Sequence, residues 1–146
     1  ESCDGIENGT GPCIVKNSHR GICPEGWHVP SSEEWETLNS WVDNDNDGVM
    51  NDNAGYSLKS KTGWFENKNG ADEYGWNGLP GGKRYVNAYS RQFEDGSQVG
   101  TWWSTFDGHV NTQYVLHWSL AYNTGHFYWT AYFKYYYGYS VRCVKD

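Results

Sequence analysis

The clearest helical pattern in the chain begins at Ser31. Ser31 is a favoured N-cap residue, and Glu34, three residues later, can bond back to the amide of the cap, which makes a capping box. The apolar side chains that follow recur at helical spacing and share one side: Trp35, Leu38, Trp41 and Val42. We therefore expect a helix over about 31–42, with this side packed on the core.

The C-terminal third changes to a period of two, which is typical of strands. Side chains alternate over 114–122 and again over 126–137, and Asn123-Thr124-Gly125 between them is a plausible turn. The pattern predicts a β-hairpin that buries one face. The expected inward side chains are Leu116, Trp118, Leu120, Phe127, Trp129 and Phe133.

The rest of the chain is rich in Gly, Asn and Asp, which favours irregular loops. We expect short strands at 57–59, 74–76, 101–105 and 139–144. Residues 1–22 look like an N-terminal arm and residues 23–146 like one domain, with no internal repeat or linker. The predicted fold class is α+β: one clear helix, short antiparallel strands, a C-terminal hairpin and long loops.

Composition modifies this picture in two ways. The 146 residues include 9 Trp, 12 Tyr and 5 Phe, so aromatic rings must supply much of the core. The formal net charge of −7, with scattered Lys and Arg, argues against nucleic acid as a partner, and the chain has no apolar run that would insert into a membrane.

Four cysteines, at positions 3, 13, 23 and 143, suggest two disulfides and an oxidising compartment. A tetrahedral metal site is the competing interpretation, but it usually needs paired Cys-x-x-Cys spacings, which are absent. We therefore expect a secreted or cell-surface protein.

An acidic loop follows the predicted helix. It places oxygen-bearing side chains at alternate positions and a glycine at the sixth, as a calcium loop does. The candidate ligands are Asp43, Asp45, Asp47, the Val49 carbonyl, Asn51 and Asp52. Position twelve is Ala54, so the loop is no complete EF-hand, and a solvated acidic turn is the alternative. We expect a structural calcium ion.

The outward face of the hairpin carries Tyr128, Tyr132 and Tyr136 beside His126 and Lys134. Tyrosines with polar neighbours are typical of surfaces that bind sugars or proteins, although a second buried aromatic layer is an equal alternative. The candidate ligand-binding residues are Asn111, Tyr114, His117, Asn123, His126, Tyr128, Tyr132, Tyr135, Tyr136 and Tyr137.

Catalytic residues are not evident. The five histidines show no metal-binding spacing, and His28 is expected to be structural. Asp72 and Glu73 have no assigned role. We expect no enzymatic activity.

Three stretches carry a family resemblance. They are Cys23-Pro24-Glu25-Gly26-Trp27-His28-Val29-Pro30-Ser31 with Glu34-Trp35, then Tyr74-Gly75-Trp76-Asn77-Gly78-Leu79-Pro80-Gly81-Gly82, and Trp102-Trp103-Ser104 with Ser140-Val141-Arg142-Cys143-Val144. In order and spacing the chain resembles the Fibrobacter succinogenes major paralogous domain over about residues 20–146.

The resemblance implies a C-type-lectin-like fold related to the formylglycine-generating-enzyme group, with both termini in one sheet. It also implies that Cys23 bonds Cys143, which leaves Cys3 for Cys13. The sugar motifs of calcium-dependent lectins and a catalytic cysteine pair are absent, and the acidic loop departs from the family pattern.

Members of this family occur in exported bacterial proteins, often beside adhesive or polysaccharide-related modules, and related domains display diversified surfaces. We therefore expect a bacterial ligand-binding or adhesion module for a glycan or a protein. A structural subunit of a surface filament, with self-assembly through the same face, is the alternative, and a carbohydrate-active enzyme is the weakest.

Overall fold

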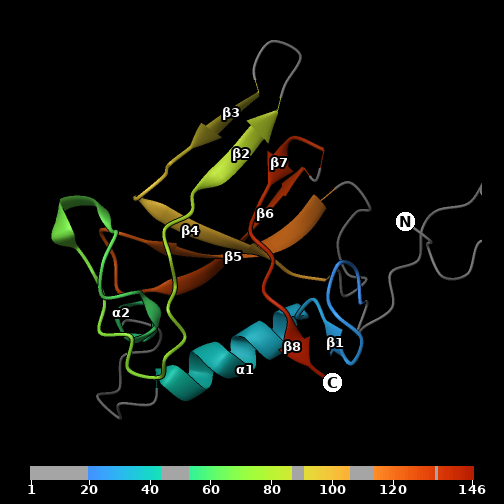
Figure 1. Ribbon diagram of the computed structural model, residues 1–146, viewed down its shortest axis with the longest axis horizontal. Coiled ribbons are helices and arrows are strands. Elements are labelled where there is room, and N and C mark those ends of the chain that lie inside the picture. The colour runs from blue at the N-terminus through green and yellow to red at the C-terminus, as the bar shows by residue number, and fades with distance from the viewer. Residues whose placement is uncertain (1–19, 44–52, 87–90, 106–113, 134) are drawn as a thin grey trace, which may run out of the picture.

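The computed structural model describes residues 20–43, 53–86, 91–105, 114–133 and 135–146, and its arrangement is drawn in Figure 1. The protein is a mixed α+β fold with one main helix, α1 (Ser32–Val42), a short α2 (Ala54–Leu58) and a 3-10 turn at Phe65–Asn67. The strands among the described residues are β1 (Trp27–His28), β2 (Lys83–Val86), β3 (Arg91–Glu94), β4 (Val99–Trp103), β5 (Tyr114–Ala121), β6 (Phe127–Phe133), β7 (Tyr137–Gly138) and β8 (Val144–Lys145). They form three small sheets, β1–β8, β3–β2–β7 and β4–β5–β6, whose neighbouring strands are antiparallel.

The helix α1 begins as the sequence predicts. The Glu34 amide donates to Ser31 Oγ at 3.2 Å, and the Ser31 amide donates to Glu34 Oε2 at 2.8 Å, which completes the capping box. Trp35 and Val42 are buried, but the expectation that Trp41 packs inward is wrong. Six residues after Trp35, Trp41 lies about 120° around the helix from it, and its exposed ring contacts Tyr74 instead.

The predicted hairpin is present as β5 and β6, in the register Leu120↔Phe127 to Tyr114↔Phe133. The second strand ends at Phe133 rather than at Tyr137. The chain turns at 135–136, and Tyr137 and Gly138 then pair with β2 in a different sheet. Gly138 therefore lies in β7 and not beyond the last strand of the hairpin.

Four shorter strand predictions have mixed outcomes. The strand at 101–105 is confirmed as the end of β4, and the last strand is reduced to β8. The predictions at 57–59 and 74–76 are wrong: Ser57 lies in α2, and the second segment is a turn. The hairpin β2–β3 was missed because strands of four residues show too little alternation to be recognised.

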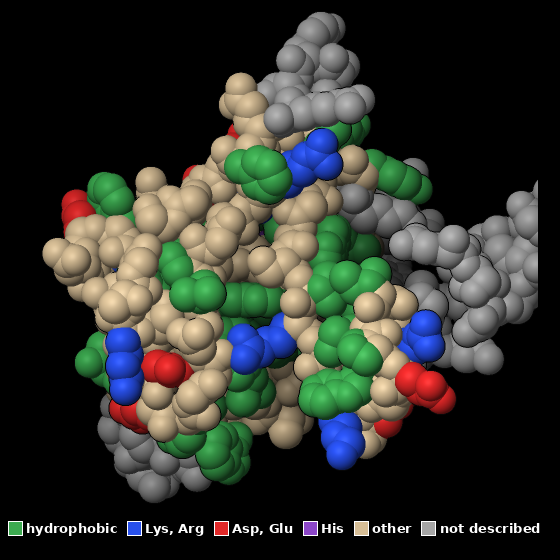
Figure 2. Space-filling model, viewed as in Figure 1, with side chains coloured by type: hydrophobic (Ala, Val, Ile, Leu, Met, Phe, Trp, Pro, Cys, Tyr) green, Lys and Arg blue, Asp and Glu red, His purple; other side chains and the backbone are tan. Residues whose placement is uncertain are grey.

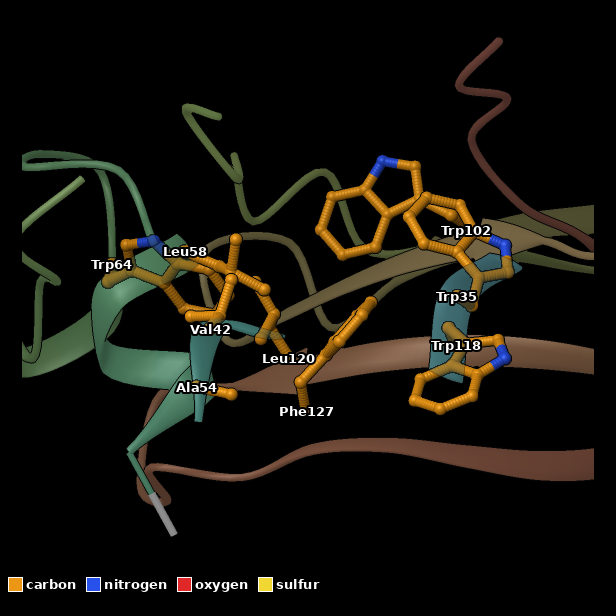
Figure 3. Packing of buried hydrophobic residues seen from close by; sticks show 9 residues of the cluster. All are labelled: Trp35, Val42, Ala54, Leu58, Trp64, Trp102, Trp118, Leu120 and Phe127. Carbon is orange, nitrogen blue, oxygen red and sulfur yellow. The ribbon is translucent and has the colours of Figure 1, made fainter. Parts of the chain in front are cut away.

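Aromatic rings fill the core, as the composition suggests (Figure 3). The buried cluster comprises Trp35, Val42, Ala54, Leu58, Trp64, Trp102, Trp118, Leu120 and Phe127. Trp35 meets Phe127 edge to face, with 5.7 Å between ring centroids. Trp129 is 57% exposed, against expectation, because it lies on the edge strand β6 while the core ends at its neighbour Trp118.

The turn of the hairpin is held by α2 and the residue that follows it. The Gly55 amide donates to the Gly125 carbonyl at 2.6 Å, and a Cβ at Gly55 would lie 2.4 Å from that oxygen, so only glycine fits. The buried ammonium of Lys59 donates to the carbonyls of Ala121 and Thr124, and burial lowers its pKa. These contacts fix one end of β5–β6.

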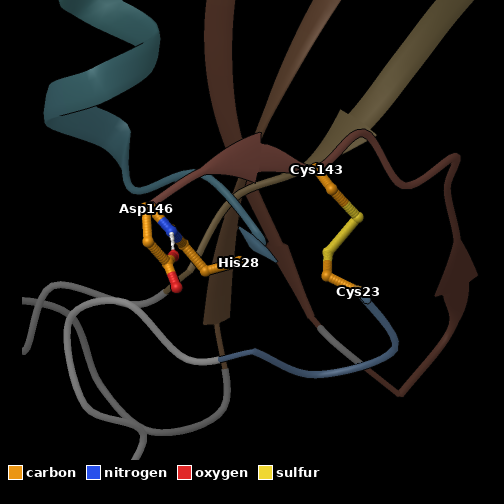
Figure 4. Close-up of a disulfide and its surroundings, with 4 residues drawn as sticks. All are labelled: Cys23, His28, Cys143 and Asp146. Atoms are coloured by element: carbon orange, nitrogen blue, oxygen red, sulfur yellow. Dashed lines mark hydrogen bonds and ion pairs between the residues drawn. A yellow bond between two sulfur atoms is a disulfide. The ribbon is translucent and has the colours of Figure 1, made fainter. Parts of the chain in front are cut away.

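The two ends of the domain are joined, as the family resemblance implies. β1 pairs with β8, and Cys23 is bonded to Cys143 across 120 residues of chain (Figure 4). Beside the disulfide, the buried His28 bonds Asp146 Oδ1 through Nδ1 at 2.5 Å and Glu34 Oε1 through Nε2 at 2.9 Å. Cys3 and Cys13 lie outside the described residues.

We predict that Cys23→Ser/Cys143→Ser lowers the free energy of unfolding by about 4 kcal/mol, because the bond closes a long loop of the unfolded chain. Guanidinium unfolding of the variant and the wild type measures the change. As a control, alkylation of the unreduced wild type should label neither cysteine. An unchanged free energy of unfolding in the variant would contradict this role.

We also predict that stability falls as the pH rises above about 6.5, the ordinary histidine pKa. The hydrogen bond to Asp146, with help from Glu34, raises the pKa of His28. The protonated ring is thus favoured in the folded state, and its contribution is lost as the pH passes the raised pKa. His28→Gln should be less stable than the wild type at pH 6 by about 1–3 kcal/mol and should lack this decline in urea titrations. A decline that persists in the variant would place its origin elsewhere.

Candidate functional site

The outward face of the β5–β6 hairpin is fixed by its register. Leu120, Trp118 and Phe127 point into the core, so the alternate residues point outward. This outward row contains Tyr128 opposite Ser119 and Tyr132 opposite Val115, both partly exposed. The sequence pattern predicts that Tyr128 and Tyr132 lie on the outward face, and the register places them there.

β7 adds a second set of rings to this face. Tyr137 packs against Tyr132, with centroids 5.2 Å apart, and against Tyr85 of β2 at the same distance. Tyr139, two residues on, lies nearly parallel to Tyr137 at 5.8 Å. We call Tyr128, Tyr132, Tyr137 and Tyr85 the tyrosine surface.

A stack of rings supports the tyrosine surface from below. His117 of β5 lies between two rings, stacked on Tyr139 at 4.4 Å and on Tyr132 at 5.4 Å. Tyr139 also contacts Trp103 of β4 at 4.6 Å. Because β4, β5, β6 and the residue that follows β7 contribute to this stack, the exposed rings are held in place before any ligand arrives.

Burial keeps the supporting stack uncharged at neutral pH. His117 is only 4% exposed, and this burial lowers its pKa to about 4, so the ring is neutral. Burial also raises the pKa of Tyr139. The His117 Nδ1 and the Tyr139 hydroxyl have no hydrogen-bond partner within the described part of the chain. The stack therefore carries no net charge, and these two polar atoms are buried within it.

One ion pair borders the tyrosine surface. Lys83 Nζ lies 2.8 Å from Asp95 Oδ2 and 5.9 Å from the centroid of Tyr137. Although partial burial opposes it, the hydrogen bond to Asp95 raises the pKa of Lys83. The pair neutralises itself, so the adjoining surface is aromatic and polar rather than charged.

The sequence-predicted ligand residues do not form one site. His117, Tyr132 and Tyr137 come together through ring contacts, and Tyr128 shares their face four residues from Tyr132. Tyr135 and Tyr136 lie in the exposed turn before β7, and Tyr114 is half-buried at the start of β5. Asn123 and His126 lie at the opposite end of the hairpin, more than about 20 Å from Tyr132 along the strands. Asn111 lies outside the described residues.

Sequence reasoning missed four contributors: Lys83, Tyr85, Trp103 and Tyr139. Tyr139 shares the parity of Tyr137, which is a signal that could have been used. Lys83 and Tyr85 lie in the unrecognised strand β2, and nothing local connects them with β6.

Of the predicted calcium ligands, Asp43 lies among the described residues. Asp45, Asp47, Val49, Asn51 and Asp52 lie outside the described residues. Asp43 ends α1, and its Oδ1 accepts from the Asn53 amide at 3.4 Å. Among the residues that are described, no group of three or more His, Cys, Asp or Glu side chains is placed to hold a metal ion.

The acidic residues left without a role have structural contacts. Asp72 Oδ1 accepts from the Asn77 amide at 2.6 Å, and Glu73 Oε2 accepts from the Ser57 hydroxyl at 3.2 Å.

On the face in Figure 2, acidic and basic side chains are interspersed, and hydrophobic side chains form several separate patches. No helix in the described part of the chain is long and apolar enough to cross a membrane.

Comparison with known proteins identifies a family. Residues 13–145 match the model of the Fibrobacter succinogenes major domain, which covers most of the chain. No curated protein and no solved structure matches. The motifs that carry the resemblance lie at structural positions: Cys23 and Cys143 form the disulfide, and Arg142 donates to the Trp76 carbonyl and lies over its ring. The chain belongs to the Fibrobacter succinogenes major domain family.

Proposed function

We propose that this protein is an extracellular ligand-binding module of a bacterial surface or secreted protein, with the tyrosine surface as its contact site for a glycan or a protein. The observation that carries the proposal is the support of partly exposed tyrosines by an uncharged stack of rings centred on the buried His117. The disulfide supports the extracellular part of the proposal.

The physical advantage of this arrangement is low entropic cost. A tyrosine ring offers a large contact area with few rotatable bonds, and its hydroxyl orients the partner. Because Tyr132 and Tyr137 pack on each other and on fixed rings, little side-chain freedom is left to lose on binding. An aromatic platform with hydroxyl edges suits both the apolar face of a sugar and a protein surface.

We predict that Tyr132→Ala weakens binding at least about tenfold, because Tyr132 joins the exposed surface to the stack below. A glycan array and a panel of surface proteins, screened first with the wild type, would supply the ligand for titration. Tyr56→Ala is the matched control, since Tyr56 is 50% exposed against 46% for Tyr132 and lies on α2. Equal losses in both variants, or none in Tyr132→Ala, would remove the tyrosine surface from the proposal.

The alternative function, a structural subunit of a surface filament, uses the same exposed rings. Sedimentation separates the two: a monomer at all concentrations supports ligand binding, whereas self-association that Tyr132→Ala abolishes supports the filament.

We further propose that the acidic segment from Asp43 to Ala54 binds a structural calcium ion. Its alternating oxygen ligands support this, as does the way its ends are held: Asp43 caps α1, Ala54 opens α2, and the Asp43 carboxylate meets the Asn53 amide.

The expected consequence is that a chelator lowers the melting temperature by several degrees, because an ion that binds only the folded state stabilises it. Calorimetry with and without calcium measures the shift, with magnesium as the control ion. Asp45→Asn/Asp47→Asn should melt alike with and without calcium. A melting temperature of the wild type that does not respond to chelator would contradict the calcium site.

A further inference from the structure

The sheet β3–β2–β7 has a second face, turned away from the tyrosine surface. Arg84 is directly opposite Phe93 of β3 on one side and Gly138 of β7 on the other. Cross-strand partners point to the same face, whereas the neighbours Tyr85 and Tyr137 point to the opposite one. Phe93, Arg84 and Gly138 therefore form one row across the sheet.

This row lies in a cleft of about 260 Å³. The cleft is lined by Gly81, Gly82, Lys83, Arg84, Phe93, Gly138, Tyr139 and Ser140. Its volume lies just below the range of roughly 300–1,000 Å³ that is typical of drug-sized ligands, so it suits one small ring. In Figure 2 a basic side chain lies over β2 with hydrophobic side chains on both sides of it.

Arg84 gives the cleft its charge. Its exposed guanidinium makes no hydrogen bond or ion pair with any described residue, in contrast to Lys83, which is paired with Asp95. A guanidinium binds a carboxylate through two parallel hydrogen bonds. One unneutralised cation favours a monoanion over a doubly charged phosphate.

Phe93 and the glycines give the cleft its shape. The Phe93 ring is 84% exposed beside Arg84, so its flat apolar face is accessible to a ligand that Arg84 holds. Gly138 adds no side chain to the cleft beside Arg84, where a Cβ would lie 3.4 Å from the Arg84 Cβ, in ordinary van der Waals contact. The Ser140 hydroxyl lines the cleft and has no hydrogen-bond partner among the described residues.

We propose that this cleft binds a carboxylate-bearing monosaccharide unit, a hexuronate, with the carboxylate on Arg84, the apolar face of the sugar ring on Phe93 and a hydroxyl on Ser140. The row supplies one group for each part of such a ligand: a cation, a flat apolar surface and a hydroxyl. The row lies on the face of the sheet opposite the tyrosine surface, and although Lys83 and Tyr139 also line the cleft, none of the four tyrosines of that surface does.

The test is an NMR titration of the ¹⁵N-labelled protein with glucuronate, with glucose and acetate as matched probes. We expect saturable glucuronate binding in the millimolar range, with shifts at Gly82, Arg84 and Gly138, and affinities for glucose and acetate at least about tenfold weaker. Arg84→Gln should weaken glucuronate binding at least about tenfold. Gly138→Val should do the same by filling the cleft with the charge unchanged.

Two controls separate this site from other effects. Lys61→Gln removes one exposed positive charge from another part of the surface and should leave glucuronate binding unchanged. Tyr132→Ala should also leave it unchanged, so the proposal stands or falls independently of the tyrosine surface.

The proposal is overturned if no saturable binding occurs, if glucose binds as well as glucuronate, or if folded Arg84→Gln and Gly138→Val both bind like the wild type. Acetate that binds as tightly as glucuronate would show a bare anion site and reject the sugar. Should Arg84→Gln fail to fold, Phe93→Ala takes its place, with the same weakening expected.

Discussion

Edge-to-face packing of aromatic rings is the interaction on which this structure depends. Trp35 of α1, Trp76 of a long loop, Trp102 of β4 and Phe127 of β6 contact one another, with centroids 4.8–6.1 Å apart. These four rings join the helix, the loop and the central sheet without the aliphatic side chains that usually fill such a core. The packing also decides which face of the hairpin is buried, and so which tyrosines are left outside.

Closure of the chain ends complements this core. The disulfide, the β1–β8 pair and the His28 contacts lie together at one end of the molecule, so three different interactions hold the same junction. Glu34 takes part twice, since it closes the capping box of α1 and bonds His28. The start of α1 is thereby tied to β8 and to Asp146.

Local signals and long-range pairing differ in how far the sequence reveals them. The N-terminus of α1, the β5–β6 hairpin and the outward position of Tyr128 and Tyr132 follow from capping chemistry and from alternation over long stretches. Strands β2, β3 and β7 are two to four residues long and exist because they pair with one another. The register of these strands depends on pairing between segments far apart in the sequence. For this reason neither the Tyr137–Tyr85 contact nor the row from Phe93 to Gly138 could be predicted.

In the sheet β3–β2–β7, successive residues of β2 point to opposite faces. Lys83 and Arg84 are adjacent cations that both line the cleft, but alternation turns the Lys83 side chain toward Tyr137 and Asp95 and the Arg84 side chain toward the face that carries Phe93. The charge of Lys83 is neutralised by Asp95, and His117 below the tyrosine surface is neutral, so that surface carries no net charge from either residue. The Arg84 charge has no acidic partner among the described residues, and the chain as a whole is negative, so among the side chains that the structure describes Arg84 is the one that can attract an anion to the cleft, and the overall field opposes it. One strand of four residues can therefore serve an uncharged aromatic contact site on one face and a site for an acidic ligand on the other.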